Sequence, residues 1–226
     1  MKKLSQKSTL EQGLRRLCII TDYLPAPSET FIRAHIERLP AEVVLIHGWR
    51  PTVGNRRLLS FPERLVHKAL RILTGRGLQL ETTATYARAF KHYRTEAVLA
   101  EYGTTGVKAM EACRRLGIPL IVHFFGFDAT EQSILKEHAE TYPAMFAKAA
   151  AVIACSRAMQ KKLISLGAHP DIVHYNPCGA DCEFFRGAAP NEAAAVFLAV
   201  GRFFATARPL SGAKPTLLPS VSCPRR

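Results

Sequence analysis

Short, continuous runs of apolar residues recur along the first 175 residues of the chain. Each run spans four to six residues, and polar residues or glycine follow most of them. Runs that are continuous, and not alternating, are typical of strands that helices cover on both faces of a sheet. Six strands are therefore predicted: Leu17–Thr21, Val43–His47, Ala97–Ala100, Leu120–Phe125, Ala151–Cys155 and Ile172–Tyr175.

Stretches with helical periodicity lie between several of these runs. Glu29–Leu39, Thr105–Leu116 and Ser156–Leu166 place apolar side chains three or four positions apart. Gly117 and Gly167 follow two of these stretches, as expected for helix C-terminal ends. Strands that alternate with helices in this way predict an α/β fold with a Rossmann-like, doubly wound parallel sheet.

The segment Arg50–Gly77 has a different character. It contains seven lysine or arginine residues against the single acidic residue Glu63, and Leu58, Phe61 and Leu65 fall on one helical face. This pattern predicts a basic amphipathic helix. Such a helix either packs on the sheet as a surface helix or attaches to anionic lipid headgroups.

The net charge of +13 on 226 residues favours an anionic partner. Nucleic acid, an anionic membrane surface and a phosphorylated substrate all qualify. Because the basic residues are not interleaved with aromatic residues on a recognisable module, nucleic acid is not the partner that we expect. The length suits one domain plus a remnant of a second, or two very small domains.

The six cysteines include no CxxC pair. Their placement within apolar runs predicts reduced and mostly buried thiols, with no metal site. The first 13 residues are basic and polar, and no apolar stretch of signal-peptide length follows them. The apolar runs are too short to span a bilayer, so we expect a cytoplasmic protein that is at most peripheral to the membrane.

Ligands of open α/β sheets bind beyond the carboxyl ends of the strands, so each strand exit is a candidate site. After the first run, Ser28 can cap a helix, and the free N–H groups at that helix start either hold an anion or are simply capped. After the third run, Gly103 either lets a ligand approach the backbone or simply makes a tight turn. After the fourth run, His123 and Asp128 either position and polarise a hydroxyl group or serve as a sheet histidine and a capping aspartate.

Five short segments occur in a fixed order along the chain: Ser28–Ile32, His123–Ala129, Cys155–Met159, Asn176–Asp181 and Val200–Phe203. Together they resemble the family-four glycosyltransferases of the GT-B fold. The resemblance is greatest to members that assemble bacterial polysaccharides, including colanic-acid-type enzymes, and it runs from about Cys18 to Arg202.

The resemblance implies two Rossmann-like domains, of which the first receives the acceptor and the second binds a nucleotide sugar. It also implies sugar transfer with retention of configuration, without an obligatory metal or another cofactor. The acceptor would be a polysaccharide or a lipid-linked saccharide at the inner face of the membrane. We expect the acceptor to contact Ser28, Glu29, Gly103 and Gly126, catalysis to involve His123 and Asp128, and Arg202 to bind the donor diphosphate.

The chain departs from the family pattern in three places. Phe125 stands where the family often has a second histidine, and no lysine follows Arg202 within Phe203–Pro209. The segment 203–226 contains four prolines and no acidic residue, so the rest of the donor domain is not recognisable there. A shift of reading frame is our hypothesis for this change.

The expected organisation has four parts: a basic extension over 1–16, an acceptor domain over 17–190, the first strand of a donor domain over 191–202, and an irregular tail over 203–226. On this interpretation the chain is a glycosyltransferase by descent that is incomplete and inactive by itself. The alternative is a non-catalytic module that binds an acceptor or an anionic lipid.

Overall fold

A computed structural model of the chain describes residues 16–48, 51–58, 77–180 and 182–183. Nearly all of them belong to one unit, Met1–Ala180, and only Cys182 and Glu183 belong to a second unit, Asp181–Arg226. The expected donor-domain strand over 191–202, with Arg202, and the expected tail 203–226 lie outside the described residues, as does nearly all of the extension 1–16.

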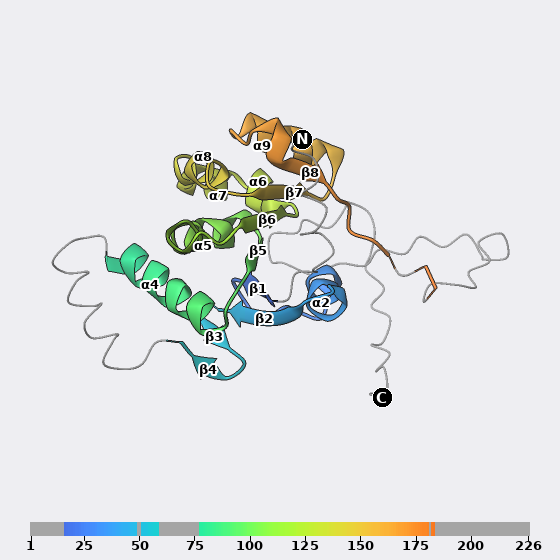
Figure 1. The fold of residues 1–226 in the computed structure, drawn as a ribbon. Helices are drawn as coiled ribbons and strands as arrows, with labels where there is room; N and C mark the ends of the chain where they lie inside the picture. Colours follow the sequence, from blue (N-terminus) through green and yellow to red (C-terminus); the bar gives the residue numbers. More distant parts are fainter. Residues whose placement is uncertain (1–15, 49–50, 59–76, 181, 184–226) are drawn as a thin grey trace, which may run out of the picture. The chain divides into compact units, whose positions relative to one another are not determined.

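The described strands form one eight-stranded sheet with the order β4-β3-β2-β1-β5-β6-β7-β8 (Figure 1). Neighbouring strands are parallel from β2 to β8, whereas β3 and β4 are antiparallel additions at the edge. The strands are β1 Arg16–Thr21, β2 Glu42–His47, β3 Thr52–Val53, β4 Arg56–Arg57, β5 Ala97–Glu101, β6 Leu120–Phe124, β7 Ala151–Ala154 and β8 Val173–Tyr175. All six predicted strands are confirmed within one residue at each end.

Helices connect the parallel strands. They are α2 Thr30–Arg38, α4 Gly77–His92, α5 Gly103–Leu116, α6 Phe127–Thr130, α7 Gln132–Glu137, α8 Thr141–Phe146, α9 Arg157–Ser165 and the short 3₁₀ helix η1 Pro170–Ile172. The three predicted helices correspond to α2, α5 and α9. As predicted, Ser156 caps α9, because its Oγ accepts a hydrogen bond from the Met159 amide, and Gly117 ends α5 with a φ of 65°.

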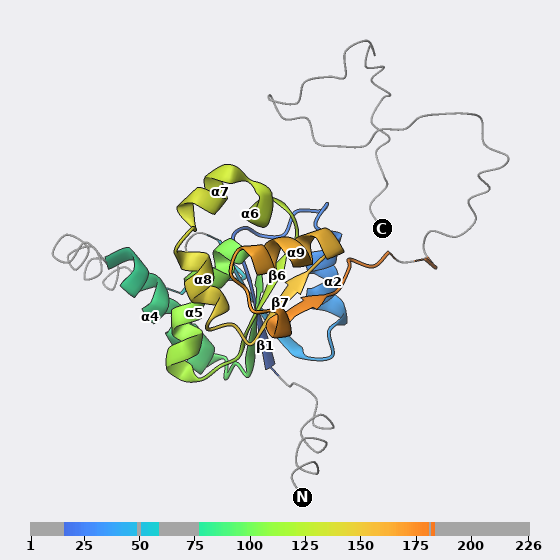
Figure 2. The ribbon, with the colours of Figure 1, turned by 90° about the horizontal axis from the view of Figure 1, so that it is seen from above.

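The sheet has a core on each face, which confirms the doubly wound class. Leu17 and Ile19 pack with residues around α2, whereas Cys18 and Ile20 face the larger core that includes α4, α5, α8 and α9. Successive side chains of a strand point to opposite faces, so a continuous apolar run serves both cores at once. Figure 2 shows α2 on the opposite side of the sheet from α4, α5 and α8.

The predicted helix over Arg50–Gly77 is wrong at its start. Residues 51–58 hold the antiparallel strands β3 and β4, and Val53 pairs with Arg56 across the turn at Gly54 and Asn55. Gly54 has a φ of 55°, which glycine adopts without steric cost. Residues 59–76 of this predicted helix lie outside the described residues.

The predicted N-cap at Ser28 is also wrong. Glu29 occupies the N-cap position of α2, and its side chain makes no cap hydrogen bond. The Oε2 atom of Glu29 instead accepts a hydrogen bond from the Ala26 amide, 2.7 Å away. The loop before α2 is therefore closed by Glu29.

The cysteines within the described ranges are free thiols. Cys18 and Cys113 are buried, as predicted, but Cys178 and Cys182 are exposed, because they lie after the last strand of the sheet. Within the same ranges, no helix is both long and apolar enough to cross a bilayer.

Candidate functional site

The order of the strands reverses between β1 and β5. The chain passes from β1 to β2 on one side, and all later parallel strands are added on the other side, from β5 onwards. In open α/β sheets such a switch point, at the carboxyl ends of the strands, is where ligands bind. The loop after β1 and the Tyr102–Gly103 turn after β5 both lie there.

Two hydrogen-bonded links hold these two loops together. The Tyr102 hydroxyl donates to Oε1 of Glu29 at 2.7 Å, and the Thr104 hydroxyl donates to Oδ2 of Asp22 at 2.8 Å. The Lys108 ammonium forms an ion pair with the other oxygen of Asp22. Glu29 thus bridges its own loop and the end of β5, and its side chain remains partly exposed.

Tyr102 itself has an unusual backbone conformation. Its φ of 78° and ψ of 145° lie in a region that side chains other than glycine rarely adopt. The residue is buried, and its hydroxyl is held by Glu29. Strain of this kind persists only where the surroundings enforce it, and it concentrates at functional sites.

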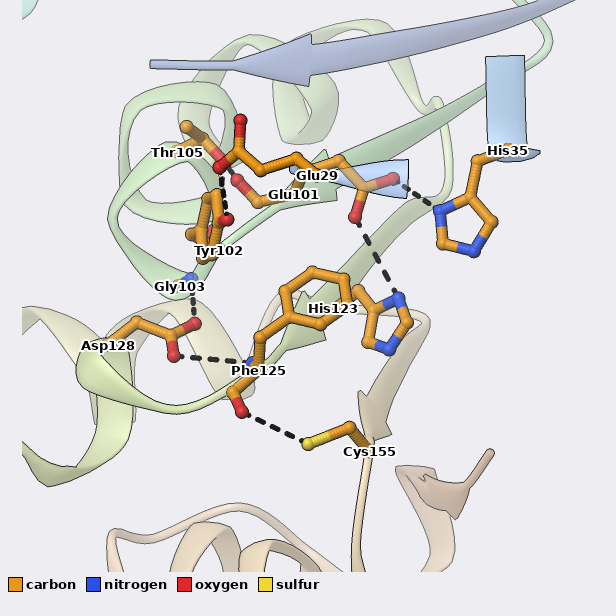
Figure 3. Close-up of polar contacts among 10 residues, drawn as sticks. All are labelled: Glu29, His35, Glu101, Tyr102, Gly103, Thr105, His123, Phe125, Asp128 and Cys155. Carbon is orange, nitrogen blue, oxygen red and sulfur yellow. Dashed lines mark hydrogen bonds and ion pairs between the residues drawn. The ribbon is translucent and has the colours of Figure 1, made fainter. Parts of the chain in front are cut away.

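Asp128 joins the turn after β5 to the turn after β6. Its Oδ2 accepts a hydrogen bond from the Gly103 amide at 3.0 Å, and its Oδ1 accepts from Gly126 at 2.9 Å and Phe125 at 3.3 Å. Figure 3 shows the carboxylate between these two turns. Burial raises the pKa of Asp128, and the amide hydrogen bonds oppose that rise.

The two glycines predicted to contact the acceptor differ in their surroundings. A Cβ atom on Gly103 would lie 2.3 Å from the Phe124 ring and 2.9 Å from the Tyr142 hydroxyl. The lack of a side chain at Gly103 therefore follows from the close packing of the first turn of α5 on Phe124 and Tyr142. A Cβ atom on Gly126 would meet no atom of the described residues within 4 Å, so this side of Gly126 is open.

A buried polar cluster lies beside these loops. The Nδ1 atom of His35 lies 2.7 Å from Oε1 of Glu101, and Nδ1 of His123 lies 3.8 Å from Oε2 of the same carboxylate. Glu101 and His123 are 0% and 2% exposed, whereas the His35 side chain is partly exposed. Burial raises the pKa of Glu101, against the opposing effect of His35. Burial, with a smaller contribution from His35, lowers the pKa of His123 to about 3.

Phe125 covers this cluster with its ring. The ring centroid lies 4.0 Å from that of His123 and 4.2 Å from that of Phe31 on α2. The Cys155 thiol donates to the Phe125 carbonyl oxygen at 3.1 Å, which ties the segment to the end of β7. Phe125 is therefore an apolar residue at the position where the family pattern often has a second histidine, and its ring shields His123.

The fold brings most of the predicted site residues together. Glu29, Gly103 and Asp128 are linked through hydrogen bonds at the switch point, and Gly126 donates its amide to Asp128. Ser28 is exposed in the loop before α2, and Arg202 lies outside the described residues. Sequence reasoning missed three residues that complete the arrangement: His35, Glu101 and Tyr102. For Glu101 the sequence did contain a signal. A glutamate at the end of an apolar run places a charged group at the end of a buried strand, which is typical of a functional site.

The model of the glycosyl transferase 4-like domain matches residues 50–179. The chain therefore belongs to this family, and the predicted resemblance to glycosyltransferases of the GT-B fold is confirmed at that level. The match does not extend to a colanic-acid type. Among curated proteins, no sequence matches the chain.

Solved structures resemble the chain in fold. Anabaena HepE in complex with UDP-glucose is 16% identical, with a TM-score of 0.50 over 79% of this chain and 48% of that one. UDP-N-acetylglucosamine 2-epimerase from Rickettsia bellii is 12% identical, with a TM-score of 0.49 over 74% of this chain and 45% of that one. MurG from Acinetobacter baumannii is 14% identical, with a TM-score of 0.45 over 74% and 46%. The chain spans about half the length of these structures.

Proposed function

We propose that this domain is the acceptor-binding half of a glycosyltransferase that moves a sugar from a nucleotide sugar to a saccharide acceptor. The observation that carries the proposal is the family match, together with polar groups gathered at the switch point of the sheet. The UDP-glucose in the complex of the structural neighbour HepE supports a nucleotide sugar as donor.

The side chains at the switch point suit different roles. Glu29 is partly exposed, so its carboxylate can accept hydrogen bonds from sugar hydroxyl groups, and the open side of Gly126 lets a ligand approach the backbone. Asp128 is fully buried and bound to backbone amides, so we assign it the positioning of both loops. Contact between His123 and the acceptor requires movement of the Phe125 ring.

The wider reaction is part of the same proposal. The acceptor is a polysaccharide or a lipid-linked saccharide at the inner face of the membrane, and transfer retains the anomeric configuration. Arg202 binds the donor diphosphate, since a guanidinium stabilises charge on a departing phosphate. Residues 17–190 form the acceptor domain, and residues 191–202 form the first strand of a donor-binding domain. The charge of +13 supports peripheral contact with anionic lipid.

Acceptor binding tests this proposal without any donor. The full chain, labelled with ¹⁵N, is titrated with a panel of oligosaccharides from bacterial surface polysaccharides and followed by NMR. We expect at least one saccharide to shift amide signals from the loops after β1, β5 and β6. Glu29→Gln should weaken that binding by about tenfold, the effect of losing one hydrogen bond to a charged group.

The matched control is Glu42→Gln. Glu42 is exposed and begins β2, so it lies at the amino ends of the parallel strands, away from the proposed site. Its loss should therefore leave saccharide binding unchanged. Saccharide-induced shifts that avoid the carboxyl ends of the strands would contradict the proposal. So would equal affinities of the Glu29→Gln and Glu42→Gln variants.

A further inference from the structure

Three elements that are distant in sequence bring His35, Glu101 and His123 together. His35 lies in the last turn of α2, Glu101 ends β5, and His123 belongs to β6. Glu101 and His123 are register partners in neighbouring parallel strands, so backbone pairing places them side by side. Figure 3 shows the Glu101 carboxylate between the two imidazole rings.

The cluster of His35, Glu101 and His123 contains buried polar atoms that have no hydrogen-bond partner among the described residues. Among the described residues, Oε2 of Glu101 and both ring nitrogens of His123 have no hydrogen-bond partner. The 3.8 Å separation between Glu101 and His123 is too long for a hydrogen bond. Burying an unpaired polar group is costly, so nearly all such groups in proteins have a partner, an ordered water or an ion. Oε2 of Glu101 and Nδ1 of His123, which are both unpaired and lie 3.8 Å apart, therefore point to a bound species.

We propose that His35, Glu101 and His123 bind a divalent transition-metal ion of the zinc class. Two imidazoles and one carboxylate are a donor set that zinc prefers, and three protein ligands leave a coordination position for water. Candidate ligand atoms of the three side chains lie within 4.8 Å of one another. Ligands about 2 Å from a tetrahedral ion are roughly 3.3 Å apart. The most distant ligand atoms must therefore approach one another when the ion binds, and this contraction is accompanied by a slight separation of His35 Nδ1 and Glu101 Oε1, which now lie 2.7 Å apart.

The surroundings permit that contraction and protect the ion. The His35 side chain is 24% exposed, so it can rotate towards the other two ligands and leave a route for the ion to enter. The Phe31 and Phe125 rings cover the other side, and an apolar shell of this kind limits access of water. A bound ion would tie α2 to the carboxyl ends of β5 and β6, next to Glu29 and Tyr102.

Zinc titration of the full chain, without sugar, tests this inference separately from the proposed function. Cys178 and Cys182 are exposed thiols that could also bind zinc, so both are changed to serine in every protein tested. The chain is stripped with a chelator, titrated with zinc chloride in a calorimeter, and analysed for metal content by mass spectrometry. We expect one zinc ion per chain, and a cobalt-loaded sample with the visible absorption of tetrahedral cobalt.

Three variants are compared with this parent. Glu101→Gln keeps the size of the carboxylate side chain, and His35→Gln replaces the imidazole by an amide. Each removes one ligand and should lower zinc affinity by at least roughly tenfold. His174→Gln is the matched control, because His174 is exposed on β8, and it should bind zinc like the parent. Zinc should also raise the melting temperature of the parent and the control by more than that of the two ligand variants.

Far-ultraviolet circular dichroism establishes that each variant is folded before titration. His35→Gln alters a partly exposed residue at a helix end, so it carries the test even if Glu101→Gln does not fold. A parent that binds no zinc would overturn the inference and leave a hydrogen-bonded cluster without an ion. Equal zinc affinity of His35→Gln, His174→Gln and the parent would overturn it as well.

Discussion

At the scale of single residues, packing treats Gly103 and Gly126 differently. Gly103 begins α5 against the Phe124 ring and the Tyr142 hydroxyl, and its amide donates to Asp128. Gly126 precedes α6, and a Cβ atom there would meet no atom of the described residues within 4 Å. Packing therefore requires glycine at Gly103 and does not require it at Gly126.

Gly103→Ala should destabilise the domain. The added methyl group must displace a buried ring, and overpacking of this kind lowers the free energy of unfolding by about 1–3 kcal/mol. Gly179→Ala is the control, because a Cβ atom at this exposed position would meet no atom of the described residues within 4 Å, and it should change that free energy by no more than about 0.5 kcal/mol. Urea denaturation, followed by circular dichroism, measures both. Equal stability of the two variants would show that the Phe124 ring has room to move.

The sequence located most site residues at strand exits but did not supply their partners. Asp128 was predicted either to act on a hydroxyl group or to cap a helix, and in the structure it accepts hydrogen bonds from its own turn and from Gly103. His35 and Glu101 are 66 positions apart in sequence. Their contact depends on how α2 packs on the sheet, and no local pattern records that packing.

At the scale of elements, the sequence predicted the ends of a helix correctly where it contains residues typical of helix caps. The α9 helix begins after Ser156 and is followed by Gly167, as its cap residues predicted. The hairpin of β3 and β4 was missed because seven basic residues and a spaced apolar series outweighed the pair Gly54–Asn55. A glycine–asparagine pair between short extended segments is a hairpin signal.

Ser156→Ala should weaken the start of α9. The Met159 amide would lose the Ser156 hydroxyl that accepts its hydrogen bond, and loss of an N-cap costs about 0.5–2 kcal/mol of stability. Ser165→Ala, in the last turn of the same helix, is the control. Its hydroxyl is exposed and bonds only locally to the Lys162 carbonyl, so we expect a change within about 0.5 kcal/mol. Thermal unfolding of both variants measures the difference, and a smaller effect at Ser156 than at Ser165 would refute the capping role.

At the scale of the whole molecule, charge is the property that most constrains the partner. The excess of 31 lysine and arginine residues over 18 acidic ones is spread along the chain, and Arg50–Gly77 contributes seven basic residues against one acidic residue. An anionic surface attracts such a protein through a sum of weak, salt-sensitive interactions. The proposed acceptor-binding function and this attraction are compatible, because a lipid-linked acceptor would present its sugar near anionic headgroups.

The full chain should bind vesicles that contain phosphatidylglycerol and not vesicles of phosphatidylcholine alone. Raising the salt from about 0.05 M to about 0.5 M should release the protein, because the Debye length falls below the distance between exposed charges. Replacing Arg64, Lys68 and Arg71 by glutamate should reduce binding more than the same change at the exposed residues Arg33, Lys91 and Lys161. Sedimentation with vesicles measures the bound fraction. Equal losses in the two triple variants would show that net charge, and not the Arg50–Gly77 segment, governs binding.

The sequence by itself determined the class of fold and the edge of the sheet where the site lies. A strand covered on both faces must be apolar at every position, so it can be recognised in the sequence as a continuous apolar run. The polar residues that follow the run mark the carboxyl end of the strand. Only the tertiary structure decided which of these polar groups meet. Asp128 reaches Gly103, Tyr102 reaches Glu29, and His35 and His123 flank Glu101 because non-neighbouring segments pack together. The contacts of Glu29 and His35 depend on the position of β5 beside β1, and those of Asp128 and His123 depend on the pairing of β5 with β6. Both neighbourhoods are properties of the assembled sheet and of no single segment.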